Sequence, residues 1–167
     1  MWALSIELAL ARALAEVHSI TGGGHGSLKP SNVVVVHESG RVVLLDYGLN
    51  AIKSNQGTMT VVPSVAYMAP EQLRGADEGP EGDMFTFGTL LYEMLMRAPA
   101  FDGSNAMEVG RHILAGNVPD AMVADSDGAV CGLIQRCWSV DPLVRPMAQE
   151  AADVLAAARM RARCWGE

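Results

Sequence analysis

Residues 84–95 carry apolar side chains on nearly every face of a helix, and this segment constrains the fold more than any other. It lacks the polar stripe of a surface helix, since its apolar residues are Met84, Phe85, Phe87, Leu90, Leu91, Met94 and Leu95. A helix that is apolar all round is stable only when other elements cover it. We interpret its methionines as packing residues rather than as a ligand surface. The sequence therefore predicts a mainly helical domain built around this segment.

Further helices are indicated by apolar residues at helical spacing. The first runs from Met1 to the glycines after Thr21, and others begin near Asn105, after Ser126-Asp127 and at Pro146. The last of these helices ends in Arg159-Met160-Arg161-Ala162-Arg163. Arginines at this end complement the negative pole of the helix dipole, and a patch for a binding partner is the alternative interpretation.

Two short β-rich runs, 33–36 and 42–45, lie between the first helix and the central one, with a polar, glycine-containing turn between them. This pattern predicts a β-hairpin, and with the helices it gives an α+β fold. A hairpin would return Asn32, before the first strand, and Asp46, after the second, to one edge. A side-chain amide and a carboxylate are hard oxygen ligands of the kind that bind Mg²⁺ together with phosphate.

Several motifs, in this order and at this spacing, resemble those of the protein kinase superfamily. Residues 25–32, His-Gly-Ser-Leu-Lys-Pro-Ser-Asn, stand where the family has H-R-D-L-K-x-x-N, and Asp46-Tyr47-Gly48 stands where it has D-F-G. Ala69-Pro70-Glu71, after Tyr67-Met68, is similar to the A-P-E motif of serine/threonine kinases. The late residues Cys137-Trp138, Asp141-Pro142 and Arg145-Pro146 resemble the pattern of the tyrosine-kinase-like group.

The resemblance implies the larger C-terminal lobe of a kinase domain over residues 1–163, with a short tail at 164–167. The fold expected from it is mainly α, with a small hairpin that carries the catalytic and metal-binding loops. The sequence contains neither the G-x-G-x-x-G loop nor the V-A-I-K lysine of the N-terminal lobe. ATP and Mg²⁺ are the cofactors implied, and we expect their binding to be weak or absent, with Val34 as the floor of the adenine pocket.

Four residues have expected roles in phosphate chemistry. By resemblance, Asn32 and Asp46 hold the metal and bind the cofactor, while Lys29 stabilises the phosphoryl group in transfer. A purely structural role for Asn32, capping its own loop, is the alternative. Ser27 stands in place of the catalytic aspartate, and a neutral hydroxyl does not take up a proton near neutral pH as a carboxylate does. Phosphoryl transfer is therefore expected to be impaired.

Four other residues have structural roles by resemblance. His25 packs in the core, and Asp83 accepts hydrogen bonds from the backbone of the catalytic loop. Glu71 and Arg145 form a buried ion pair that ties the activation segment to the late helices. The catalytic loop itself is expected to be loosely anchored, because Gly23-Gly24 replaces the apolar residues that usually precede the histidine.

The activation segment corresponds by resemblance to residues 49–68. Ser and Thr residues recur there, and the segment has no sustained periodicity, which indicates an exposed loop. One interpretation is an ordinary solvated loop, and the other is a loop ordered by phosphate on Ser54, Thr58, Thr60 or Ser64. The family arginine that often anchors such a phosphate is replaced by Gly26.

Charge and composition argue against several classes of partner. A formal charge of −7 and a pI near 5.0 disfavour nonspecific nucleic-acid binding. No apolar run is long enough for a membrane span of about 18 to 20 residues, and no signal peptide is evident. A cytoplasmic location is the default expectation. Cys131, Cys137 and Cys164 have no disulfide or zinc spacing, so we expect reduced thiols.

These features favour a serine/threonine kinase-like module that is catalytically impaired and acts through binding or regulation. One alternative is an active serine/threonine kinase when the chain is part of a longer protein. Another is an incomplete gene product without an independent role. A Ser-His nucleophile at Ser27 and His25 is the weakest hypothesis, because no orienting acid accompanies the pair. The protein partner or substrate stays unnamed at this stage.

Overall fold

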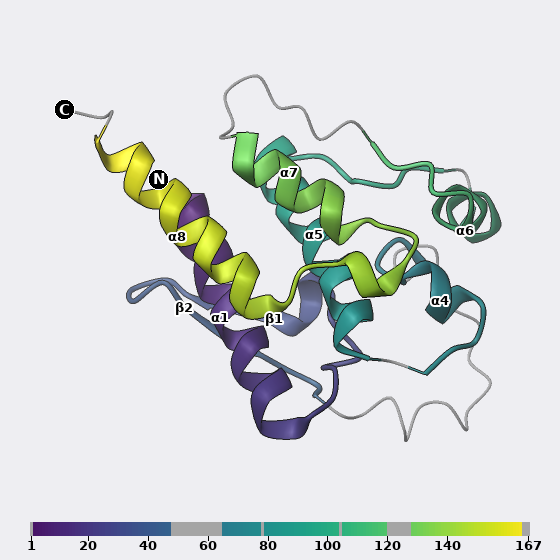
Figure 1. The fold of residues 1–167 in the computed structure, drawn as a ribbon, viewed down its shortest axis with the longest axis horizontal. Helices are drawn as coiled ribbons and strands as arrows, with labels where there is room; N and C mark the ends of the chain where they lie inside the picture. Colours follow the sequence, from purple (N-terminus) through teal and green to yellow (C-terminus); the bar gives the residue numbers. More distant parts are fainter. Residues whose placement is uncertain (1, 48–64, 78, 104, 120–127, 165–167) are drawn as a thin grey trace.

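The computed structural model describes residues 2–47, 65–77, 79–103, 105–119 and 128–164, and Figure 1 shows their arrangement. The elements follow one another as α1 (Trp2–Thr21), the 3-10 helix η1 (Pro30–Asn32), β1 (Val33–Val36), β2 (Arg41–Leu44), α4 (Pro70–Leu73), α5 (Pro80–Met96), α6 (Ala106–Leu114), α7 (Gly128–Cys137), the 3-10 helix η3 (Pro142–Val144) and α8 (Ala148–Cys164). The predicted fold class, mainly helical with one small hairpin, is confirmed.

Helix α5 is the central element of the core, as its apolar sequence predicts. Every residue from Gly82 to Tyr92 is buried. Helix α7 packs closely on α5 at Gly88, where an added Cβ would lie 2.5 Å from the Cβ of Cys137. Just after α7, the Trp138 indole donates a hydrogen bond of 3.1 Å to the Thr89 hydroxyl. The absence of a side chain at Gly88 thus sets how closely the two helices approach.

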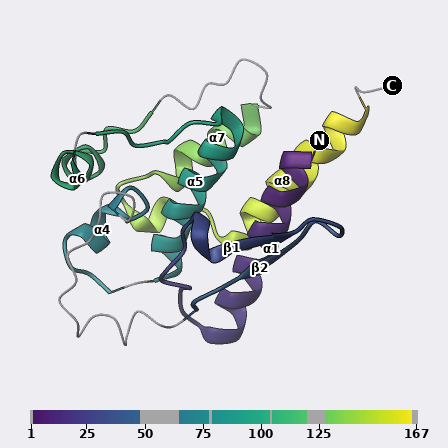
Figure 2. The same cartoon turned by 180° about the vertical axis from the view of Figure 1, so that it is seen from behind.

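Helices α1 and α8 lie side by side, and the hairpin packs against α1 (Figures 1 and 2). The interior faces of the two helices are small or aliphatic, with Leu10, Leu14, Ala151 and Leu155 buried. The far ends of the chain are thereby brought together, although more than a hundred residues separate them in sequence. This pair of helices forms the wall behind the hairpin.

The hairpin is antiparallel, with Val33 opposite Leu44 and Val36 opposite Arg41. Its turn contains Gly40 at a φ of +65°, a conformation that glycine adopts at little cost. Beyond the paired residues, the Leu45 N–H donates to the Asn32 carbonyl at 2.9 Å. The predicted return of the chain is confirmed, because this bond places the residues before β1 and after β2 at the same end.

Helix boundaries follow the predictions with two shifts, the first of which is the start of α5 at Pro80, before the predicted segment 84–95. The Asn105 side chain accepts a hydrogen bond from the Glu108 N–H at 3.0 Å, which is the expected cap of α6. Helix α8 begins at Ala148, two residues after the predicted Pro146. The predicted start of α7 at Ser126-Asp127 lies outside the described residues, as do Gly48, residues 49–64 of the activation segment and residues 165–167 of the tail.

Two of the cysteines and the membrane prediction can be compared with the structure. Cys131 and Cys137 are buried and in no disulfide among the described residues, and burial raises the pKa of the Cys137 thiol to about 12, which keeps it protonated at neutral pH. Among the helices of the described part of the chain, none is long and apolar enough to cross a membrane.

Candidate active site and its anchoring contacts

The loop of residues 25–32 is anchored to the first turn of α5 through Asp83. The backbone N–H groups of His25 and Gly26 donate to the two oxygens of this carboxylate, at 2.5 and 2.9 Å. The Nε2 atom of His18, near the end of α1, lies 2.9 Å from the same carboxylate. Asp83 is almost fully buried, so these three hydrogen bonds offset the cost of burying its charge. Asp83 thereby ties α1, α5 and the loop together.

His25 is buried against the loop that it precedes. Its Nδ1 accepts the Ser27 N–H at 3.3 Å, and its Nε2 has no hydrogen-bond partner among the described residues. Burial lowers the pKa of His25 below 6.5, and the nearby Asp83 carboxylate only partly opposes this effect. The ring is therefore neutral at pH 7, and it contacts the Tyr47 ring edge-on with centroids 6.0 Å apart.

Asn32 connects the loop to the hairpin. Its side-chain Nδ2 donates to the Ser27 carbonyl at 2.7 Å, while its backbone carbonyl accepts the Leu45 N–H. Asn32 is buried, and its hydrogen bond to Ser27 uses Nδ2, whereas a cation would bind the other polar atom of the amide, its oxygen. The hydrogen bond to Ser27 is the capping contact expected if Asn32 has a structural role in its own loop. One amide can serve both roles, because the two use different atoms.

Asp46 follows β2 and Leu45 with a φ of +61°, which is uncommon for a residue other than glycine. Aspartate tolerates this left-handed conformation better than most residues do, at a cost of about 1 to 2 kcal/mol. Such local strain is typical of functional sites, where it aims a side chain in a defined direction. The next residue, Tyr47, is 46% exposed, so water can satisfy its hydroxyl.

Lys29 and Val34 occupy the open side of this region. Lys29 is partly exposed and precedes η1 in an extended conformation, with a φ of −170°. Val34 is 41% exposed, on the face of the hairpin opposite to the one that covers the core. Both side chains can be reached from solvent, as binding to a ligand would require.

Two glycines shape the loop. Gly26 has a φ of +77°, which favours glycine where the family pattern has arginine. At Gly24, an added Cβ would lie 2.7 Å from the backbone carbon and oxygen of Gly79 and 3.1 Å from the Asp83 carboxylate. The prediction of loose anchoring at the glycines is therefore wrong at Gly24, where close backbone packing replaces the missing side chain.

We expect Gly24→Ala to destabilise the protein by about 1 to 3 kcal/mol, because the backbone of Gly79 cannot move aside as a flexible side chain would. The matched control is Gly23→Ala, since a Cβ at Gly23 would meet nothing within 4 Å. Urea denaturation of both variants measures the difference. Equal unfolding midpoints for the two variants would contradict the close packing at Gly24.

Glu71 and Arg145 form a two-pronged ion pair. The Arg145 Nη1 and Nη2 atoms donate to the two Glu71 carboxylate oxygens at 2.5 and 2.7 Å. Two backbone carbonyls, of Glu81 and Ser139, accept further hydrogen bonds from the same guanidinium, which also lies 5.3 Å from the centre of the Phe85 ring. The Arg145 side chain is completely buried. This one residue thus connects α4, α5 and the segment that leads into α8.

The donor set at the end of the hairpin fits Mg²⁺. Asn32 and Asp46 supply an amide oxygen and a carboxylate, and Mg²⁺ typically binds one or two such groups together with phosphate and water. No cluster of three or more His, Cys, Asp or Glu residues that could hold a metal occurs in the part of the chain that the structure describes. The two residues therefore suit a metal that arrives with a phosphate ligand rather than a metal held by the protein alone.

The sequence profile of the protein kinase domain matches residues 3–154. This match covers the anchored loop, the hairpin and the helices around α5. The chain belongs to the protein kinase family. It is 34% identical over 149 residues to the serine/threonine-protein kinase PkaA of Streptomyces coelicolor, and 28% identical over 146 residues to the serine/threonine-protein kinase D1044.8 of Caenorhabditis elegans.

These alignments cover 86% and 87% of this kinase-family chain but only 27% and 14% of the two relatives. The chain thus spans a small part of the length of the curated proteins that it matches. Kinases of this family generally use ATP and Mg²⁺.

Three residues that make contacts in this fold were not identified from the sequence. His18 forms a hydrogen bond with Asp83. The sequence indicates it only by its position in the last turn of the first helix. Glu93 accepts the Tyr67 hydroxyl at 2.9 Å, and burial with this carboxylate nearby raises the pKa of Tyr67 above 10. Glu7 is fully buried on α1, and its signal was an acid between the apolar residues of that helix.

Proposed function

We propose that this chain is the C-terminal lobe of a kinase-like domain and that it is impaired in phosphoryl transfer. In this proposal it acts as a binding or regulatory module in the cytoplasm. One observation supports impairment above the others: Ser27 stands in a fully anchored catalytic loop. The hydrogen bonds of the Ser27 backbone to His25 and Asn32 hold the loop, so a carboxylate is missing from a loop that is otherwise formed. General-base catalysis contributes about 10²- to 10⁴-fold to rates.

ATP·Mg²⁺ would be held by Asn32, Asp46 and Lys29, with Val34 under the base. When bound, this cofactor supplies the phosphoryl group. The chain's own residues would contribute an oxygen pair for the metal and one positive charge near the phosphates. An active serine/threonine kinase within a longer protein is the second candidate, and the similarity to serine/threonine kinases is compatible with it.

A thermal-shift titration with ATP and Mg²⁺ tests the nucleotide part of the proposal. A ligand that binds the native state raises the melting temperature by mass action, with about 1.4 kcal/mol of stabilisation at ten times the Kd. We expect a small rise at millimolar nucleotide in the wild type and none in Asp46→Ala. Asp77→Ala, which changes an exposed carboxylate that belongs to neither the 25–32 loop nor the hairpin, is the matched control and should respond like the wild type.

Transfer of labelled γ-phosphate, measured on the same samples, tests the impairment. We expect the wild type to incorporate no more label than Asp46→Ala. Transfer that requires Asp46 would favour the active kinase instead. A cooperative melt that nucleotide does not shift would remove nucleotide binding from the proposal and leave the binding module alone.

A further inference from the structure

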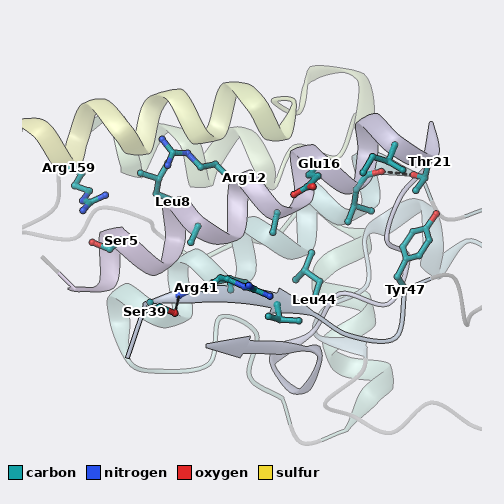
Figure 3. A pocket seen from close by; sticks show the side chains of 17 residues that line it. Ser5, Leu8, Arg12, Glu16, Thr21, Ser39, Arg41, Leu44, Tyr47 and Arg159 are labelled. Atoms are coloured by element: carbon teal, nitrogen blue, oxygen red, sulfur yellow. Dashed lines mark hydrogen bonds between the residues drawn. The ribbon is translucent and has the colours of Figure 1, made fainter. Parts of the chain in front are cut away.

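An elongated groove runs along α1, and it involves none of the residues assigned to phosphate chemistry. It lies between α1 and β2 with α8 above, and its volume is about 810 Å³ (Figure 3). Its ends are marked by the hairpin turn at Ser39 and by Tyr47. Along α1 it extends from Ser5 to Thr21, which is about 24 Å at 1.5 Å per residue. We call it the α1–β2 groove.

The dimensions suit a row of side chains. A volume of 810 Å³ spread over about 24 Å gives a mean cross-section of roughly 34 Å². This area is much smaller than the cross-section of a whole helix, whose diameter with side chains is about 10 Å. It accommodates the side chains along one edge of a docked segment, as when an amphipathic helix lays its apolar stripe into a groove.

The lining divides into an apolar floor and a charged rim. The floor residues are aliphatic, namely Leu8, Ala9, Ala13, Val17, Val42, Val43 and Leu44. The rim has Arg12 on α1, Arg41 on β2 and Arg159 on α8, as Figure 3 shows. Apolar contact would supply affinity, and the rim would select the charge of the occupant.

The rim is positive although the chain as a whole is negative. Glu16, one turn after Arg12, offsets part of the charge, so the lining residues carry three positive charges and one negative charge. None of the three guanidinium groups forms an ion pair with a described residue. On a chain with a formal charge of −7, such a site attracts an acidic ligand locally and repels it elsewhere, which favours binding at this groove.

We propose that the α1–β2 groove binds an acidic segment of a partner protein through apolar side chains at helical spacing. The proposal rests on the proposed role of the chain as a binding module, and it names the chemistry of the partner. Tyr47 lines one end of the groove and directly follows Asp46. A bound segment would therefore lie beside the metal position and could influence it.

Fluorescence anisotropy with the full chain tests this proposal. The probe is a labelled peptide of about sixteen residues, with leucines at i, i+3, i+4 and i+7 and glutamates between them. Comparison peptides carry glutamine or lysine in place of glutamate. We expect only the glutamate peptide to bind well, with affinity that falls as salt is added.

Charge reversal locates the site. We expect Arg12→Glu with Arg41→Glu to weaken the binding of the glutamate peptide at least about tenfold. Arg111→Glu on the exposed surface of α6 reverses one charge, so it is the matched control for Arg12→Glu alone, and with Arg97→Glu it matches the double variant; neither control should change the affinity. Thermal melts verify that each variant is folded.

Four outcomes would overturn the proposal. These are no binding of the glutamate peptide, equal binding of the glutamine peptide, an equal effect of Arg111→Glu, or binding of phosphatidylserine vesicles through Arg12 and Arg41 without binding of the peptide. The ATP·Mg²⁺ thermal shift of the wild type separates the two proposals. If nucleotide shifts the melt of the wild type while the glutamate peptide does not bind to it, the groove proposal fails and the nucleotide part of the proposed function stands.

Discussion

Arg145→Ala is expected to lower the free energy of unfolding by about 3 to 5 kcal/mol, as does removal of one partner from other buried ion pairs. The Glu71 carboxylate, only 19% exposed, would lose both of its hydrogen bonds to the guanidinium. The carbonyls of Glu81 and Ser139 would lose a donor, and Phe85 would lose its cation contact. Each of these losses occurs away from bulk water, where replacement partners are scarce.

The melting temperature measures this effect. For a chain of this size about 1 kcal/mol corresponds to 2 to 4 °C, so we expect a fall of about 10 °C. Arg136→Ala is the matched control, because the Arg136–Glu150 pair is equally short, at 2.7 Å, but both of its side chains are nearly half exposed. Exposed pairs contribute about 0 to 1 kcal/mol. Similar melts for the two variants would mean that the buried pair does not hold α4 to the late helices.

The sequence predicted those parts of the fold that depend on local pattern. Helix α5 was identified because its apolar residues leave no polar face, and the hairpin because two β-rich runs flank a glycine turn. The role of Asp83 came from the kinase resemblance, and its bonds to His25 and Gly26 have the form that the resemblance implies. Local pattern and motif order together were enough to place the loop on the central helix.

Contacts between distant segments could not be read from the same patterns. Nothing near Gly24 in the sequence indicates that Gly79 packs on it, because that contact depends on where the segment before α5 passes. The positive φ of Asp46 is equally hidden, since aspartate is also common in ordinary conformations. Both features belong to the catalytic loop and its surroundings, where tertiary contacts override local preference.

The anchoring contacts explain how the loop can be formed while its central residue departs from the family pattern. Asp83 binds backbone N–H groups of the loop, and Asn32 binds the Ser27 carbonyl. Backbone contacts of this kind are insensitive to the side chain at position 27. The loop can therefore keep its conformation when the residue at position 27 changes. A binding role on a kinase fold would require such a loop, formed without the catalytic carboxylate.

Glu7 is the least favourable group of the described core, and replacing it is expected to stabilise the protein. Its side chain is fully buried on α1, and neither carboxylate oxygen has a hydrogen-bond partner among the described residues. Burial raises the pKa of this carboxyl from 4.5 to about 7. Between pH 4.5 and about 7, the Glu7 carboxyl is therefore mostly protonated in the folded state and mostly ionised in the unfolded state.

The direction of the pH effect follows from this difference. Stability from this group is greatest below pH 4.5, where both states are protonated, and it is lost as the pH rises to about 7. The raised pKa corresponds to a loss of about 3 kcal/mol above pH 7. Glu7→Leu has a similar volume and no charge, so it should melt higher than the wild type by about 6 to 12 °C at pH 8 and by much less at pH 4.5.

The measurement is a series of thermal melts of both proteins from pH 4.5 to pH 8. Taking the difference between variant and wild type removes the contributions of groups that both chains share. Glu16→Leu is the matched control, because Glu16 lies on the same helix but is exposed, and its difference from the wild type should not follow the same titration. If Glu7→Leu and the wild type change stability in parallel across this range, folding does not raise the pKa of the Glu7 carboxyl, and the prediction is wrong.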